Sequence, residues 1–212
     1  MEIGCEYQDG SRAHTGRPGL SSLLGLWDSM AGALLGDEIQ RGLARLTLDR
    51  NDLRDGVNFN ERAYQRNLIH DTETYEVLVL CWRSGQHSPI HDHGRSTCGV
   101  LVIEGVATET IFGAEPGKPL IEARSCRFGA GSVMVSRGGD IHRVANLESA
   151  GIDLITLHVY SPALHGNRYY RIDGAELPTG PRSCSLYPET IVAPLRSRSA
   201  RNRDMVDPQA GG

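Results

Sequence analysis

The amino-acid sequence predicts an all-β core that is preceded by a short helical extension. From Asn51 onward, short segments rich in β-branched and aromatic residues alternate with Gly, Pro or Asp turns. No helical pattern lies between these segments, so parallel strands joined by crossover helices are not expected. A closed barrel or a double sheet is then the natural arrangement, because closure removes exposed strand edges.

The helical extension is predicted from apolar residues that recur at spacings of three and four. Ser21 or Ser22 could cap the first helix, and a second helix is expected from Asp37 to about Leu48. Both helices should pack on the outside of the barrel. The residues that carry the pattern are Leu20, Leu23, Leu24, Trp27, Met30, Ala31 and Leu34, then Ile39, Leu43 and Leu46.

The strands of the core are predicted from short apolar runs between turns. The clearest is the segment 75–82, which reads Tyr-Glu-Val-Leu-Val-Leu-Cys-Trp. Other strands are expected over 64–69, 98–103, 107–112, 120–127, 132–136, 142–146, 153–160, 169–172 and 190–192.

The chain of 212 residues fits one domain with a substantial core. We expect the helical extension, packed on the barrel, at residues 1–50 and the barrel at 51–196. A flexible tail is expected at 197–212, which contains three arginines and few apolar residues.

Composition limits the partners and the location. The formal charge of −4 gives no reason to expect a nucleic-acid partner. No apolar run approaches the ~20 residues that cross a bilayer, and the N-terminus has no signal-peptide pattern. Five cysteines without CxxC spacing argue against a disulfide framework, and Cys81, Cys126 and Cys184 are interpreted as packing or surface thiols. We therefore expect a cytoplasmic monomer with no membrane partner.

Two histidines, His91 and His93, are spaced to bind one metal ion. On a strand, residues i and i+2 point to the same face, so both imidazoles could reach the ion from one side. His142 is the obvious candidate for a third ligand. The sequence therefore predicts a metal that is held mostly or wholly by histidine.

Both histidine segments resemble the two sequence motifs of the cupin superfamily. The first motif matches at Gly85, His91, His93 and Gly105, with Cys98 at the position of the usual glutamate. The second motif matches at Gly131, Gly139, His142 and Asn146, with Arg137 at the position of proline. The resemblance implies a double-stranded β-helix, which is the cupin jelly-roll barrel.

The replacement at Cys98 affects the expected chemistry. The usual cupin glutamate is a metal ligand, and its loss leaves three histidines. Neutral imidazoles leave a divalent ion with its full positive charge and with open positions. Such a site suits an anionic substrate that binds the metal itself.

From about Tyr64 to Pro162 the chain also resembles cysteine dioxygenase. The segments that carry this resemblance are Tyr64-Gln-Arg66-Asn-Leu, Leu80-Cys-Trp82-Arg-Ser-Gly85, Ser88-Pro-Ile-His91-Asp-His93, Ser96-Thr-Cys98, Ile141-His142-Arg143-Val144 and His158-Val-Tyr160-Ser161-Pro162. The resemblance implies that the chain converts L-cysteine and O2 to L-cysteine sulfinic acid at a non-haem Fe(II) ion. Sulfinic acid is the level that a thiol reaches when it gains both oxygen atoms.

The resemblance also implies which residues bind iron and substrate. His91, His93 and His142 are expected to bind Fe(II). Arg66 is expected to pair with the substrate carboxylate, because its planar fork of donors fits two oxygens. Tyr64 supports that end of the pocket.

Three further residues are implied to serve the reaction. Tyr160 is expected to place its hydroxyl near the iron, and His158 is expected to orient Tyr160. Cys98 and Tyr160 are the equivalents of the residues that form a thioether crosslink in mammalian-type members, so the same crosslink is a possible modification here.

Other functions remain open. The substrate could be another small thiol, 3-mercaptopropionate or cysteamine, although Arg66 favours a thiol with a carboxylate. Relatives that act on mercaptopropionate carry glutamine at that position. A non-oxygenase metal-binding cupin is a further alternative, either a zinc or manganese isomerase or a protein that senses or stores a ligand.

Overall fold

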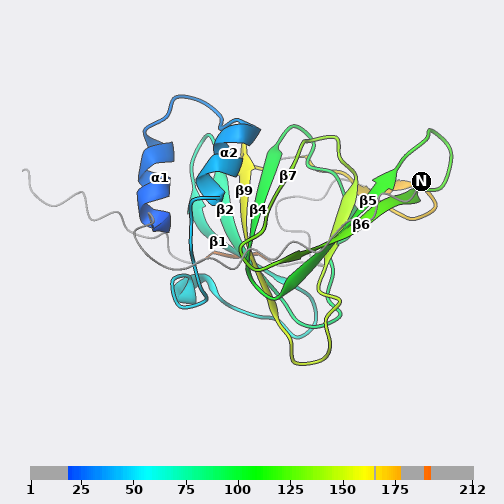
Figure 1. Cartoon of the computed structure of the whole chain (residues 1–212). Helices are drawn as coiled ribbons and strands as arrows, with labels where there is room; N and C mark the ends of the chain where they lie inside the picture. Colours follow the sequence, from blue (N-terminus) through cyan, green and yellow to red (C-terminus); the bar gives the residue numbers. More distant parts are fainter. Residues whose placement is uncertain (1–18, 165, 178–188, 192–212) are drawn as a thin grey trace, which may run out of the picture.

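The computed structural model describes residues 19–164, 166–177 and 189–191 of the chain (Figure 1). The first eighteen residues, His165, Cys184 and the expected tail at 197–212 lie outside this part. The helices are α1 (Leu20–Asp28), α2 (Gly36–Leu43) and a 3-10 helix (Arg54–Gly56). The strands are β1 (Gln65–Asp71), β2 (Glu76–Trp82), β3 (Ile90–His91), β4 (Thr97–Glu104), β5 (Val106–Gly113), β6 (Ile121–Gly129), β7 (Val133–Ser136), β8 (His142–Ala145), β9 (Leu154–Ser161), β10 (Tyr169–Tyr170), β11 (Glu176–Leu177) and β12 (Glu189–Ile191).

The strands form two six-stranded sheets. The first sheet has the order β12-β1-β2-β9-β4-β7, and the second has the order β11-β10-β3-β8-β5-β6. Neighbouring strands in the described part are antiparallel except β1 and β12, which are parallel. The predicted all-β double sheet with an N-terminal helical extension is confirmed.

Successive residues of the central strands face two different apolar layers. On β9, Ile155, Leu157 and Val159 belong to the layer that includes the helices. Leu154 and Tyr160 belong to the layer between the two sheets. Because both faces are covered, all eight residues of β9 are buried, including the polar residues Thr156, His158 and Ser161. The face of β9 toward the second sheet is the one that lines the candidate site.

Both helices lie against the first sheet, on the side away from β5 and β6 (Figure 1). Ile39 of α2 is fully buried against β4. A Cβ on Gly99 of β4 would lie 2.2 Å from Cγ2 of Ile39, so α2 can approach this strand only over glycine. Helix α2 therefore packs closely on the outer face of the first sheet.

The predicted ends of the helices are partly wrong. The N-cap of α1 is Gly19, so Ser21 and Ser22 lie inside the helix and do not cap it. The helix ends at Asp28 rather than continuing toward Leu34, which is buried in the following loop. In α2, the Glu38 carboxylate accepts a hydrogen bond from the backbone N–H of Leu35 (2.7 Å).

Each predicted strand has a counterpart with ends within two residues; the segment 64–69, for example, is observed as Gln65–Asp71. Strand β11 was not predicted, and β3 is shorter than the strand through His91 and His93 that the spacing of these histidines implied. Cys126 is disulfide-bonded, so its interpretation as a packing or surface thiol is wrong. In the described residues, no helix is long and apolar enough to cross a membrane.

Candidate metal centre

The three predicted metal ligands come together between the sheets. His91 ends β3 and His142 begins β8, and these two residues are direct partners across the antiparallel pair. Side chains of such partners lie on the same face of the sheet. The two ends of these short strands therefore bring two imidazoles side by side.

His93 reaches the cluster by a different route from the predicted one. Strand β3 stops at His91, so the pair does not lie on one regular strand. The backbone N–H of His93 donates a hydrogen bond to the carbonyl of Gly138 (3.0 Å). A Cβ on Gly138 would lie 2.1 Å from the carbonyl oxygen of Gly94, so only glycine permits this close approach. The convergence is confirmed, although its structural reason was wrongly predicted.

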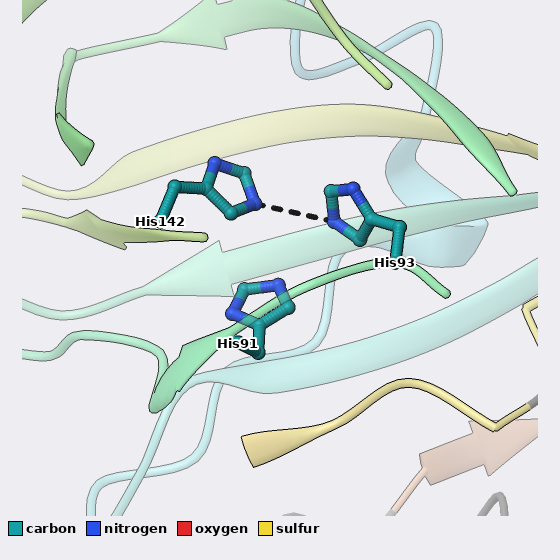
Figure 2. Close-up of side chains that lie close together, drawn as sticks. All are labelled: His91, His93 and His142. Atoms are coloured by element: carbon teal, nitrogen blue, oxygen red, sulfur yellow. Dashed lines mark hydrogen bonds between the residues drawn. The ribbon is translucent and has the colours of Figure 1, made fainter. Parts of the chain in front are cut away.

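Figure 2 shows the three imidazole rings pointing toward one another. Ligand nitrogens of His91, His93 and His142 all lie within 4.8 Å of one another, so these residues could hold one metal ion. Nε2 of His142 lies 3.2 Å from Nε2 of His93. Two imidazole nitrogens at this distance either share a proton or both face a cation, because two lone pairs alone would repel each other.

The opposite nitrogen of each ring is held by another group. Nδ1 of His91 donates to the carbonyl oxygen of Pro89 (3.0 Å), and Nδ1 of His142 donates to Oε1 of Glu109 (2.7 Å). Carbonyl and carboxylate oxygens only accept, so Nδ1 carries the hydrogen in both rings and Nε2 keeps its lone pair. The third ring, His93, has Nδ1 at 3.2 Å from the hydroxyl of Ser136. The donor set therefore fits a metal ion on the Nε2 side.

The rings of His91 and His93 are held in the neutral form that binds metals. Burial, and then the nearby His142, lower the pKa of His91 to about 3. Burial, and then the nearby His91, lower the pKa of His93 well below its usual value. At neutral pH both rings are therefore unprotonated at one nitrogen and can act as ligands.

Arg66 and Tyr64 lie at the side of the site that β1 forms. Arg66 is the cross-strand partner of Leu80, which faces the layer between the sheets. Its guanidinium carbon lies 5.8 Å from the ring centre of Tyr160. The ring of Tyr64 stacks on Trp82, with centroids 4.2 Å apart and planes 11° apart. A positive charge thus lies next to Tyr160, and an aromatic pair supports β1 beside it.

A chain of hydrogen bonds runs along the inner face of β9. Nε1 of Trp82 donates to Oγ1 of Thr156 (3.0 Å), which lies 2.9 Å from Nε2 of His158. Nδ1 of His158 lies 3.2 Å from the hydroxyl of Tyr160. Residues 156, 158 and 160 alternate with 157 and 159, which face the helices, so strand parity alone places all three toward the site.

Cys98 lies directly opposite Tyr160 on the neighbouring strand β4. Both side chains are buried, and Sγ of Cys98 lies 3.9 Å from Nδ1 of His158. Burial raises the pKa of the Cys98 thiol above its usual value. The ring of Tyr160 lies 5.4 Å from that of His93, so the Cys98–Tyr160 pair borders the metal centre.

Two carboxylates at the site were missed by sequence analysis. Asp92, between the two histidines, is fully buried and accepts hydrogen bonds from Gly94, Arg168 and Tyr170. No sequence signal identifies it, because its partners lie far along the chain. Glu109 could have been found, since it lies two residues from the buried Ala107 in a predicted strand and therefore points to the same, inner face.

A double sheet with three converging imidazoles defines a metal-binding cupin. Residues 30–172 match the family model described as cysteine dioxygenase type I. The chain belongs to the cysteine dioxygenase type I family.

Individual proteins agree with this assignment. The chain is 26% identical over 145 residues to cysteine dioxygenase type 1 of Danio rerio, covering 63% of this chain and 69% of that protein. It is 27% identical over 137 residues to cysteine dioxygenase type 1 of Homo sapiens, covering 59% of this chain and 64% of that protein. A Klebsiella pneumoniae protein with a double-stranded β-helix domain covers 59% of this chain and 90% of its own, with 18% identity and a TM-score of 0.46.

Proposed function

We propose that this chain is an Fe(II)-dependent thiol dioxygenase that converts L-cysteine and O2 to L-cysteine sulfinic acid. The observation that carries the proposal is a three-histidine centre beside an arginine and a buried Tyr160, with no carboxylate in the ligand set that the described residues form. The reaction is balanced without a further reductant, because the thiol sulfur supplies the electrons and both oxygen atoms stay in the product.

In this proposal His91, His93 and His142 hold the iron. Two of the three rings have their Nδ1 hydrogens committed to Pro89 and Glu109, which supports metal binding through Nε2. When bound, Fe(II) supplies a centre at which the thiol loses its proton and O2 becomes reactive toward sulfur.

Arg66 is proposed to bind the carboxylate of cysteine. A guanidinium group matches two carboxylate oxygens, and this pairing would orient the thiol toward the histidines. Tyr64 is proposed to hold this end of the pocket through its stacking on Trp82. The proposal explains why a positive charge lies close to a set of neutral ligands.

Tyr160 is proposed to donate a hydrogen bond toward the reacting groups. The Thr156 hydroxyl already accepts from Trp82, and among the described residues its other side-chain partner is His158, so the hydroxyl hydrogen goes to Nε2 of His158. Burial lowers the pKa of His158 well below its usual value, so the ring is neutral and its single hydrogen is on Nδ1. That hydrogen points at the oxygen of Tyr160, which leaves the phenolic hydrogen for the substrate side.

The state of Tyr160 supports the same role. Burial, and then the adjacent Cys98, raise the pKa of Tyr160 well above its usual value, so the phenol keeps its proton at neutral pH. Cys98 is proposed to form a thioether with Tyr160, because the two residues are direct cross-strand partners. The Sγ–H bond of Cys98 and a ring C–H bond of Tyr160 are broken as the S–C bond forms, and O2, the co-substrate of the proposed reaction, takes up the two electrons and two protons. The crosslink would fix the ring of Tyr160 beside His93.

The test is O2 consumption after anaerobic loading with Fe(II), with sulfinate measured as product. L-cysteine, 3-mercaptopropionate and cysteamine are compared at equal concentration, and loading with zinc or manganese is the matched metal control. We expect the highest kcat/KM with L-cysteine and iron. Iron-loaded protein that consumes no O2 with any of the three thiols would contradict the proposal, and a preference for another thiol would correct the substrate.

A further inference from the structure

The three histidines differ in the group that holds their second nitrogen. His91 is paired with a backbone carbonyl and His93 with a neutral hydroxyl. His142 alone is paired with a carboxylate, at 2.7 Å from Nδ1 to Oε1 of Glu109. The contact lies on the far side of the His142 ring from Nε2, which faces His93. Glu109 therefore contacts a candidate ligand without belonging to the ligand set.

The position of Glu109 follows from strand register. On the paired strands β5 and β8, Ile111 lies opposite His142 and Glu109 lies opposite Val144. Positions two residues apart share one face, so Glu109 reaches His142 diagonally. Only 12% of the Glu109 side chain is exposed, and only 4% of that of His142, so water screens this contact weakly.

In the described part of the chain, no arginine or lysine forms an ion pair with Glu109, and its ion-pair partner is His142. The other buried carboxylate of the site behaves differently. Asp92 forms an ion pair with Arg168 (2.9 Å) and also accepts from Tyr170 (2.8 Å). Of the two carboxylates, Glu109 is the one whose charge is left to act through a candidate ligand.

We propose that Glu109, acting through His142, supplies the metal centre with the negative charge that the glutamate replaced by Cys98 would supply as a ligand. The carboxylate draws the Nδ1 hydrogen of His142 toward itself, which makes Nε2 a stronger donor. Glu109 is thus a positioning residue: it fixes the ring orientation and hydrogen position of His142 and strengthens its bond to a cation. The charge also favours the more highly charged state of a bound redox metal, and the inference rests on the proposed iron site.

The test compares the wild type with Glu109→Gln and Glu109→Ala. Glutamine keeps the shape and can still accept from Nδ1 but has no charge, whereas alanine removes both. Glu122→Gln, the same change at an exposed position of β6, is the matched control. Fe(II) affinity is measured anaerobically by competition with a chromophoric chelator, and the reduction potential of bound iron by redox titration.

We expect Glu109→Gln to weaken Fe(II) binding by about 10- to 100-fold and to raise the reduction potential, and we expect no change in the control. In the metal-free protein, nitrogen NMR should find the hydrogen of His142 on Nδ1 in the wild type and on either nitrogen in Glu109→Ala. Glu109→Asp keeps the charge and should bind iron more tightly than Glu109→Gln.

The outcomes separate this inference from the proposed function. If the wild type binds no Fe(II), the iron site itself is wrong. If the wild type binds Fe(II) and Glu109→Gln matches it in affinity and potential, the charge role of Glu109 is overturned and the iron site stands. The charge role is also overturned if Fe(II) binding is weakened in Glu109→Ala but not in Glu109→Gln, because an uncharged hydrogen-bond acceptor would then be enough to support His142.

Discussion

Asp92→Asn is expected to lower the stability of the protein and its affinity for a metal ion. The Asp92 carboxylate is fully buried and accepts four hydrogen bonds. Its Oδ1 accepts from the backbone N–H groups of Gly94 and Arg168, and its Oδ2 accepts from Nε of Arg168 and the hydroxyl of Tyr170. The three bonds from Arg168 and Tyr170 attach the segment with both histidines to β10 and to the residue before it.

The magnitude follows from the number of donors that asparagine cannot satisfy. Its oxygen can replace Oδ1, but its NH2 group would face two donors, Nε of Arg168 and the hydroxyl of Tyr170. A hydrogen bond to a charged group is worth about 1.5–3 kcal/mol, so losing two costs up to about 6 kcal/mol. The Arg168 side chain is 48% exposed and can turn toward water, so we expect a loss of about 2–4 kcal/mol.

Thermal unfolding of the metal-free protein measures this loss. For a chain of this size, 2–4 kcal/mol corresponds to a fall in Tm of roughly 4–16 °C. Fe(II) affinity should fall as well, because Asp92 lies between His91 and His93. The control is Asp55→Asn, which removes an exposed ion pair with Arg54 (4.0 Å) and should cost less than about 1 kcal/mol. An Asp92→Asn protein with the same Tm as the Asp55→Asn control would refute the reasoning.

Three further predictions concern the substrate, the crosslink and the helices. Arg66→Ala should raise KM for L-cysteine by about 10- to 100-fold with a smaller effect on kcat, since one charge-assisted contact is lost; an unchanged KM would refute the carboxylate contact. Intact-mass measurement should find the wild type lighter by two hydrogen atoms where the Cys98–Tyr160 thioether has formed, and Cys98→Ala should abolish that difference. Burial of Asp28 acts to raise its pKa, but hydrogen bonds from Tyr75 (2.6 Å) and His70 outweigh it and lower the pKa. The stabilisation, at most about 1 kcal/mol because the Asp28 side chain is 43% exposed, should be present above about pH 4 and lost as the pH falls further, so Asp28→Asn should match the wild type only in acid.

The alternation of side chains along strands predicts most of the fold and the site residues that β9 contributes. On β9 the alternation of Thr156, His158 and Tyr160 with two apolar residues can be read directly from the sequence. The ligands His91 and His142 were also found, because their motif spacing is independent of the exact strand ends.

What the sequence did not reveal depends on contacts between distant segments. Asp92 holds the histidine segment in place only because Arg168 and Tyr170, which are distant in the sequence, lie next to it in the fold. Glu109 contacts His142 only in the register that β5 and β8 adopt. His93 is placed by the close approach of Gly138 to Gly94, which has no periodic signal. Residue spacing therefore identified the ligands but not the groups that hold them.

Strand β9 is buried on both faces, so it separates the layer that contains the metal centre from the layer under the helices. Leu154 and Tyr160 face the layer that contains the histidines, and Ile155, Leu157 and Val159 face the layer beneath α1 and α2. A shortened chain that begins after α2 would expose Ile155, Leu157 and Val159 to water, and the same strand would then have no support behind the site. The helices thus support, from behind, the strand that lines the metal centre, so a substitution on either face of β9 also bears on the packing of the other face.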